Sequence, residues 1–115
     1  MKRAMLLLTL AGCATAGTAE DFGWMIQVPS QVNRGAEFQV TVRSMRATGR
    51  VATGVEYSYQ VLWPGGLQSP RGTGYSGEPL KLRAPPAAGP AMLVVICPNR
   101  KGQDIKVQEA PFDVK

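Results

Sequence analysis

From Phe22 onward the chain consists of short stretches in which hydrophobic and polar residues alternate. A period of two puts successive side chains on opposite faces of a β-strand, and β-branched and aromatic residues at the hydrophobic positions favour that interpretation. The stretches are Phe22 to Val28, Phe38 to Arg43, Val55 to Trp63, Leu80 to Arg83, Met92 to Cys97, and a closing segment with Ile105, Val107, Phe112 and Val114. They predict six strands, or seven if the segment from Leu67 to Thr73 is also extended.

Turn-forming residues separate these stretches, and no window shows a helical period. Glycine, proline and asparagine gather at Asn33-Arg34-Gly35, Pro64-Gly65-Gly66, Pro85-Pro86 with Gly89-Pro90, and Pro98 to Gly102. Such residues favour tight turns, and the 9 prolines of the chain disfavour helices. The pattern therefore predicts an all-β domain at residues 22–115, folded as an antiparallel β-sandwich.

The same segments resemble the immunoglobulin-like modules of bacterial envelope proteins. The resemblance rests on Val28-Pro29 with Arg34 to Val42, Gly54 to Trp63, the turn Thr73 to Gly77, and the closing Phe112-Asp113-Val114. It implies an immunoglobulin-like sandwich, while a transthyretin-like sandwich of similar size stays open. The second predicted strand has no cysteine to meet Cys97, which excludes the disulfide-bridged core of antibody domains.

The first 13 residues form a separate unit. A basic start, Met1-Lys2-Arg3, precedes the apolar run from Ala4 to Leu10, which is the pattern of an export signal. The run is about half of the roughly 20 apolar residues that a membrane-spanning helix needs. Leu10-Ala11-Gly12-Cys13 then resembles the lipobox of bacterial lipoproteins. That resemblance implies cleavage before Cys13, lipidation of its thiol and, because Ala14 follows, placement in the outer membrane.

We therefore expect a lipoprotein signal peptide at residues 1–12, a lipidated flexible tether at 13–21 and the sandwich domain at 22–115. Two alternatives stay open, namely ordinary signal-peptidase cleavage after Ala14-Thr15-Ala16 and a cytosolic protein with an apolar start. Either export route leaves Cys97 as the one free thiol, so no internal disulfide is expected. Because no histidine is present to activate it, we interpret Cys97 as a small core residue and expect no disulfide-linked oligomer.

Composition removes several classes of function. The chain has no histidine, which excludes Ser-His-Asp and Cys-His catalysis and histidine-ligated metals. Without Lys2 and Arg3, 11 basic residues stand against 8 acidic ones, and this excess is too small to indicate nucleic-acid binding. The carboxylates Glu37, Glu56 and Glu78 form no visible pair. We expect no cofactor and no enzymatic activity.

The glycine-rich segment from Gly72 to Gly77 matches the dinucleotide-binding pattern G-x-G-x-x-G. A dinucleotide site needs a helix directly after the glycines, whereas here Pro79 and an alternating stretch follow, so we expect a turn.

Two groups of side chains could bind a ligand but are expected to pack in the core instead. Soft ligands that suit Cu(I) occur, unclustered, at Met25, Met45, Met92 and Cys97. Aromatic rings that could stack on a sugar occur at Tyr57, Tyr59, Trp63 and Tyr75, and three of them share one strand face.

Basic residues gather in two predicted loops. Arg43, Arg46 and Arg50 bracket the loop after the second strand, and Arg100 and Lys101 lie in the last hairpin loop. In an immunoglobulin-type sandwich both loops lie at the end where the chain enters the domain. We therefore expect these side chains to lie beside the tether and to face anionic headgroups or an acidic protein partner. Ordinary solvated loops are the simpler alternative.

These features predict a lipid-anchored protein of the bacterial cell envelope that acts as a non-enzymatic binding or structural module. Its expected partners are the membrane, through the anchor, and an envelope protein. The runner-up is a periplasmic accessory protein that binds a small ligand or a metal ion. An enzyme whose acid pair is assembled by folding is the third alternative.

Overall fold

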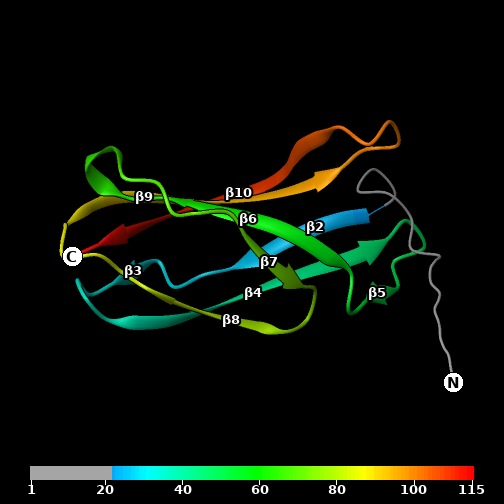
Figure 1. Ribbon diagram of the computed structural model, residues 1–115. Coiled ribbons are helices and arrows are strands. Elements are labelled where there is room, and N and C mark those ends of the chain that lie inside the picture. Colours follow the sequence, from blue (N-terminus) through cyan, green and yellow to red (C-terminus); the bar gives the residue numbers. More distant parts are fainter. Residues whose placement is uncertain (1–21) are drawn as a thin grey trace, which may run out of the picture.

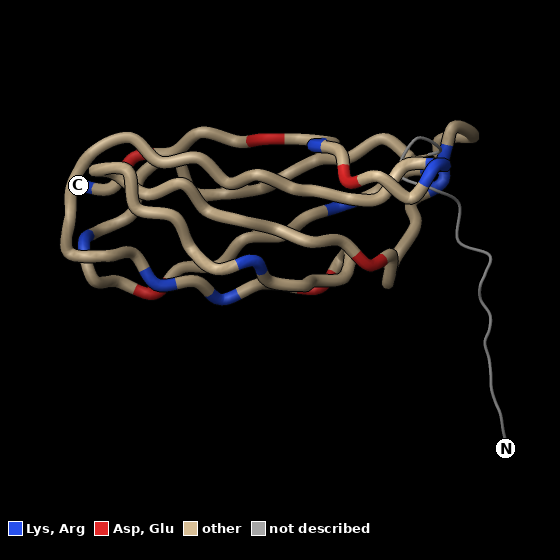
Figure 2. The backbone as a smooth tube through the Cα atoms, turned by 45° about the horizontal axis from the view of Figure 1, so that its top comes forward, with Lys and Arg blue, Asp and Glu red and all other residues tan. Residues whose placement is uncertain are grey.

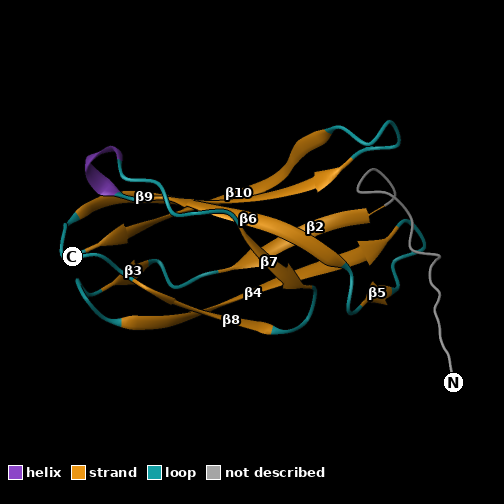
Figure 3. Ribbon diagram, viewed as in Figure 1, coloured by secondary structure: helices purple, strands orange, loops and turns teal. Residues whose placement is uncertain are grey.

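The computed structural model describes residues 22–115, which form two β-sheets packed face to face (Figure 1). The predicted signal peptide, Cys13 and the tether lie outside the described residues. The strands are β2 (Phe22–Gln27), β3 (Gln31–Val32), β4 (Glu37–Arg46), β5 (Val51–Ala52), β6 (Glu56–Leu62), β7 (Gly72–Tyr75), β8 (Pro79–Arg83), β9 (Gly89–Pro98) and β10 (Asp104–Val114). A single 3-10 turn, η2 (Pro64–Gly66), is the one helical element in this range (Figure 3). No helix in the described part of the chain has the length and hydrophobicity to cross a membrane.

The strand order is that of an immunoglobulin-like sandwich. One sheet has the order β3-β10-β9-β6-β7, and the other has the order β2-β4-β5, with β8 also paired to β4. The first two long strands thus share a layer with β8, while β6, β9 and β10 form the opposite layer, as the corresponding strands do in immunoglobulin domains. The predicted all-β, immunoglobulin-like fold is confirmed.

One strand pairing departs from the expected antiparallel arrangement. Strand β3 runs parallel to β10, with Gln31 opposite Asp113 and Val32 opposite Val114. The chain leaves β2 at Val28 and Pro29, where proline supplies no N–H to a strand ladder. It then crosses to the edge of the other sheet, where Gln31 and Val32 form a short strand that the alternation did not predict.

The core consists of the inward-facing rows of both sheets. Its fully buried side chains include Val40 and Val42 of β4, Tyr57 and Val61 of β6, and Leu93 and Val95 of β9. Cys97 is 3% exposed and has no disulfide partner, as expected for a small core residue. Burial, with a smaller contribution from the charge of Asp104, raises the pKa of the Cys97 thiol to about 11.

The glycine-rich motif forms an edge strand, and only Ser76 and Gly77 make the expected turn. In β7, Gly74 lies opposite Tyr57 and Gly72 opposite Tyr59. A Cβ atom at either glycine would lie 2.5 Å from the Cζ atom of the facing tyrosine. Glycine is therefore needed at both positions, because a tyrosine ring of β6 lies over each of them on this edge strand. The seventh strand exists, but it lies at Gly72–Tyr75 and overlaps only the end of the predicted segment.

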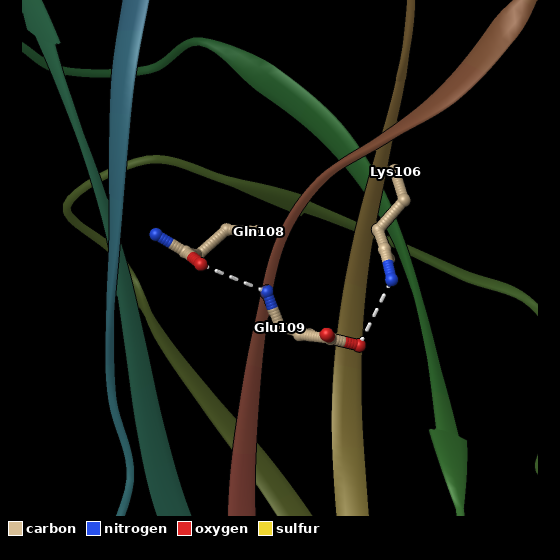
Figure 4. Close-up of polar contacts among 3 residues, drawn as sticks. All are labelled: Lys106, Gln108 and Glu109. Carbon is tan, nitrogen blue, oxygen red and sulfur yellow. Dashed lines mark hydrogen bonds and ion pairs between the residues drawn. The ribbon is translucent and has the colours of Figure 1, made fainter.

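A bulge in β10 connects the two sheets. The register with β9 shifts between Lys106 and Gln108, which leaves Val107 as the extra residue. The Gln108 side chain accepts a hydrogen bond from the Glu109 backbone N–H at 3.1 Å and donates one to the Trp24 carbonyl of β2 at 3.0 Å. Lys106 Nζ and Glu109 Oε2 form an ion pair at 3.1 Å across the bulge (Figure 4). The closing segment is therefore one strand of 11 residues that also contacts the edge of β2.

Candidate functional site

The two basic loops lie at the end of the sandwich where the described chain begins. Figure 1 places the turn after β4, the β9–β10 loop and the start of β2 at this end. The pairing register agrees, because Phe22, the first residue of β2, lies opposite Arg46, the last residue of β4. Lys and Arg backbone segments gather there in Figure 2. We call Arg46, Arg50, Arg100 and Lys101 the basic end.

Arg46 belongs to the inward-facing row of β4 but emerges at the end of the core. Its guanidinium carbon lies 5.3 Å from the centroid of the Phe22 ring, within the range of a cation–π contact. Its backbone closes the turn, since the Arg46 N–H donates to the Arg50 carbonyl at 2.9 Å and the Gly49 N–H donates to the Arg46 carbonyl at 2.8 Å. Arg46 therefore covers the first ring of the core while its charge remains at the surface.

The β9–β10 loop is held in shape by Asn99. The Asn99 side-chain oxygen accepts hydrogen bonds from the backbone N–H groups of Lys101 at 2.9 Å and Gln103 at 3.0 Å. This is the local side-chain bonding that favours asparagine in turns. Beside the loop, Arg71 forms an ion pair of 2.9 Å with Asp104. The loop therefore presents Arg100 and Lys101 from an ordered backbone, next to a carboxylate that is already paired.

Arg43 does not join the basic end. It lies three residues before the end of β4, on the outer face of the sheet, where its Nε donates to the Gln27 side chain at 3.1 Å. At about 3.3 Å per residue, its Cα lies about 10 Å along the strand from that of Arg46. The structure thus brings four of the five predicted side chains to the end loops and places the fifth on a sheet face.

The outer face around Arg43 holds an apolar cluster, two members of which, Met25 and Met45, were expected to pack in the core. Met25 is 53% exposed, Met45 is 40% exposed and Val51 is 54% exposed. With Gly23 and Arg43 they line a cleft of about 210 Å³. Alternation could have revealed them, because Met25 and Met45 occupy the strand face opposite to buried Trp24 and Ser44. We call Met25, Met45 and Val51 the apolar cluster.

The four soft ligands are not brought together. Met25 and Met45 lie on the outer face of one sheet, while Cys97 lies in the core and Met92 is half-buried on the other sheet. Within residues 22–115, no group of three or more His, Cys, Asp and Glu side chains could hold a metal ion. Of the four aromatic candidates, Tyr57 is buried, Tyr59 and Trp63 pack against the core, and Tyr75 is exposed.

Comparison with known proteins adds a likeness of fold. No protein-family model matches the chain, and neither does any curated protein. Among solved structures, the chain is similar to the CARDB domain of the PF1109 protein from Pyrococcus furiosus, a structure determined in complex with di-metal ions. The two chains are 17% identical, with 83% of this chain and 86% of that chain covered and a TM-score of 0.46. A likeness at this level carries no information on what this chain binds.

Proposed function

We propose that the protein is a lipid-anchored module of the bacterial cell envelope, without enzymatic activity, whose basic end faces an anionic surface beside the membrane. That surface is either lipid headgroups or an acidic protein partner. The observation that supports the proposal is the position of the basic end at the point where the chain arrives from Cys13.

The length of the tether strengthens this argument. Residues 13–21 number nine, so even fully extended they span at most about 30 Å. The sandwich itself is 47 Å long. An anchor at Cys13 therefore keeps the basic end within about 30 Å of the membrane, while the opposite end, where the carboxyl terminus lies, is not held in this way (Figure 1). Cations held near an anionic bilayer contribute up to about 1 kcal/mol each, and salt screens them over about 8–10 Å.

The anchor is tested first. The mature protein should partition into detergent, and its mass should exceed that of the chain beginning at Cys13 by a diacylglycerol group and a further acyl chain. Two or three long chains make membrane attachment effectively permanent, at about 0.8 kcal/mol for each buried CH₂. An unmodified soluble protein that begins at Gly17 would refute lipidation.

The basic end is tested with the lipid-free mature chain and liposomes. Arg50→Ser with Lys101→Ser should weaken binding to anionic liposomes at low salt, and high salt should remove the difference. Arg34→Ser with Lys115→Ser is the matched control, because it removes the same charge from the opposite end, where the Arg34 N–H donates to the Lys115 carbonyl. Equal effects of both pairs would contradict the proposal for lipid headgroups.

A protein partner is tested by crosslinking and pull-down from detergent-solubilised membranes. If the acidic surface belongs to a protein, a specific envelope protein is recovered with the native chain and lost with the Arg50→Ser, Lys101→Ser variant. Failure of both the liposome and the pull-down experiments would reduce the basic end to ordinary solvated loops.

A further inference from the structure

The apolar cluster is a candidate interaction surface on the outer face of the β2-β4-β5 sheet. The pairing register puts Met25 opposite Arg43 and Met45 opposite both Gly23 and Val51, so the three apolar side chains lie side by side across β2, β4 and β5. Gly23 contributes no side chain, which leaves the cleft open between Met25 and Met45. Contiguous exposed apolar side chains rimmed by polar groups are typical of interaction surfaces.

Arginines border this cluster, and its lining includes no carboxylate. Arg43 lines the cleft itself, and Arg50 directly precedes Val51 in the chain. A second hollow, of about 580 Å³, is lined by Arg46, Thr48, Gly49 and Arg50. Apolar side chains among cations, without an anion, are the combination that suits the headgroup region of an anionic bilayer.

The charge of the wider sheet face has the same sign. The cross-strand partners Gln39 and Lys81, and Glu37 and Arg83, continue the outer face beyond Arg43, so three cations share it with one carboxylate. The outer side of the five-stranded sheet instead carries the carboxylates Glu56, Asp104, Glu109 and Asp113, of which Asp104 and Glu109 are paired with Arg71 and Lys106. The first face therefore carries a net positive charge and the second a net negative one, so an anionic surface favours the first.

We propose, building on the function proposed above, that the apolar cluster inserts into the headgroup region of an anionic bilayer and that Arg43 contacts the surrounding phosphates. The sandwich then lies with its β2-β4-β5 face toward the membrane and its five-stranded sheet directed away. The occupant is the bilayer because the cluster lies at the chain's arrival point, within reach of a nine-residue tether, and its only charged lining group is cationic.

The test places a single label on the lipidated, full-length mature protein. Cysteine is introduced by Met25→Cys, with Leu67→Cys as the control. Leu67 is 54% exposed, nearly the same as Met25, but follows η2 at the opposite end of the sandwich (Figure 1). Native Cys97 stays in place because its burial keeps it from labelling, and Cys13 is blocked by its lipid.

The protein carries a nitroxide label and is reconstituted into vesicles of phosphatidylglycerol with phosphatidylethanolamine, or of phosphatidylcholine alone. In the anionic vesicles the label at position 25 should be protected at least tenfold from a water-soluble relaxing agent and remain accessible to oxygen. The label at position 67 should be unaffected. Equal water accessibility at positions 25 and 67 in lipidated, vesicle-bound protein overturns the insertion of the cluster and leaves the anchored function standing.

A second variant removes the cluster without a label. Met25→Ser, Met45→Ser and Val51→Thr change exposed side chains, so folding should be retained, and the lipid-free chain should lose about tenfold in binding to anionic vesicles because apolar surface is no longer buried. Leu67→Ser should lose nothing. If position 25 is protected in native membranes but not in pure lipid vesicles, a protein covers the cluster and the bilayer assignment is wrong.

Discussion

The glycines of β7 give the sharpest test of how the sandwich is packed. Replacing Gly74 with alanine would put a Cβ atom 2.5 Å from the Cζ and hydroxyl oxygen atoms of Tyr57. Ordinary carbon contacts lie at about 3.5–4.0 Å, so the atoms would overlap by about 1 Å. Tyr57 is 1% exposed and has no room to move. Overpacking of this kind lowers the free energy of unfolding by about 1–3 kcal/mol. Alanine also restricts the unfolded chain more than glycine does, which offsets about 0.4–1 kcal/mol of that loss.

Gly72 supplies a matched control. Its Cβ atom would come equally close to Tyr59, at 2.5 Å, but Tyr59 is only partly buried and its ring can turn toward solvent. We therefore expect Gly74→Ala to lower the free energy of unfolding by about 1–2 kcal/mol and Gly72→Ala to change it by less than about 1 kcal/mol. The burial of the facing ring, and not the glycine itself, sets the difference.

Urea unfolding of the lipid-free mature chain, followed by circular dichroism, measures both values. For a domain of this size each kcal/mol corresponds to roughly 4–8 °C in Tm, so thermal unfolding gives an independent check. In a Tyr57→Leu background, Gly74→Ala should cost much less, because the clashing ring is gone. Equal costs for the two glycine variants, or an undiminished cost in the Tyr57→Leu background, would refute the argument.

Three further predictions concern the Cys97 thiol, the Tyr57 hydroxyl and the Gln108 side chain. Cys97→Ala should cost about 1–3 kcal/mol of stability without affecting vesicle or partner binding. Because burial raises the pKa of Cys97 to about 11 in the folded protein, its contribution to stability is complete below pH 9 and is lost as pH rises through 11. The Cys97→Ala variant should therefore lose less stability than the native protein between pH 9 and 11. Rapid thiol labelling of the native protein at pH 8 would contradict the burial of Cys97. The Tyr57 hydroxyl is buried without a hydrogen-bond partner, so Tyr57→Phe should leave stability unchanged or raise it by about 1 kcal/mol, with exposed Tyr75→Phe as the control in the same urea titration. Gln108→Met should cost about 0.5–1 kcal/mol, because the partly buried Trp24 carbonyl loses its partner whereas water can replace the exposed bond at the bulge; unchanged urea unfolding would show that the bulge does not depend on this side chain.

Local pattern was sufficient to predict most of the strands. The alternation in Phe38 to Arg43 and Val55 to Trp63 matches β4 and β6 because one face of each strand is buried and the other is not. The same reasoning, combined with the topology of the fold, predicted that the two basic loops share an end with the start of the domain. Burial of Cys97 also followed from its position at the end of an apolar stretch. The anchor at Cys13 remains a prediction from sequence.

Other features depend on partners that are distant in the sequence. The segment Gly72–Tyr75 has no hydrophobic alternation and becomes a strand only because Tyr57 and Tyr59 of β6 supply the side chains that it lacks.

The apolar cluster divides in the same way. Alternation along β2 and β4 puts Met25 and Met45 on the faces opposite to Trp24 and Ser44, but only the pairing of β2, β4 and β5 places them near one another, with Val51 and Arg43. The amino-acid sequence by itself determined which segments are extended and where charge is available. Only the tertiary structure decided which side chains of different strands lie beside one another, because that depends on strand pairing and on the layer packed against each face.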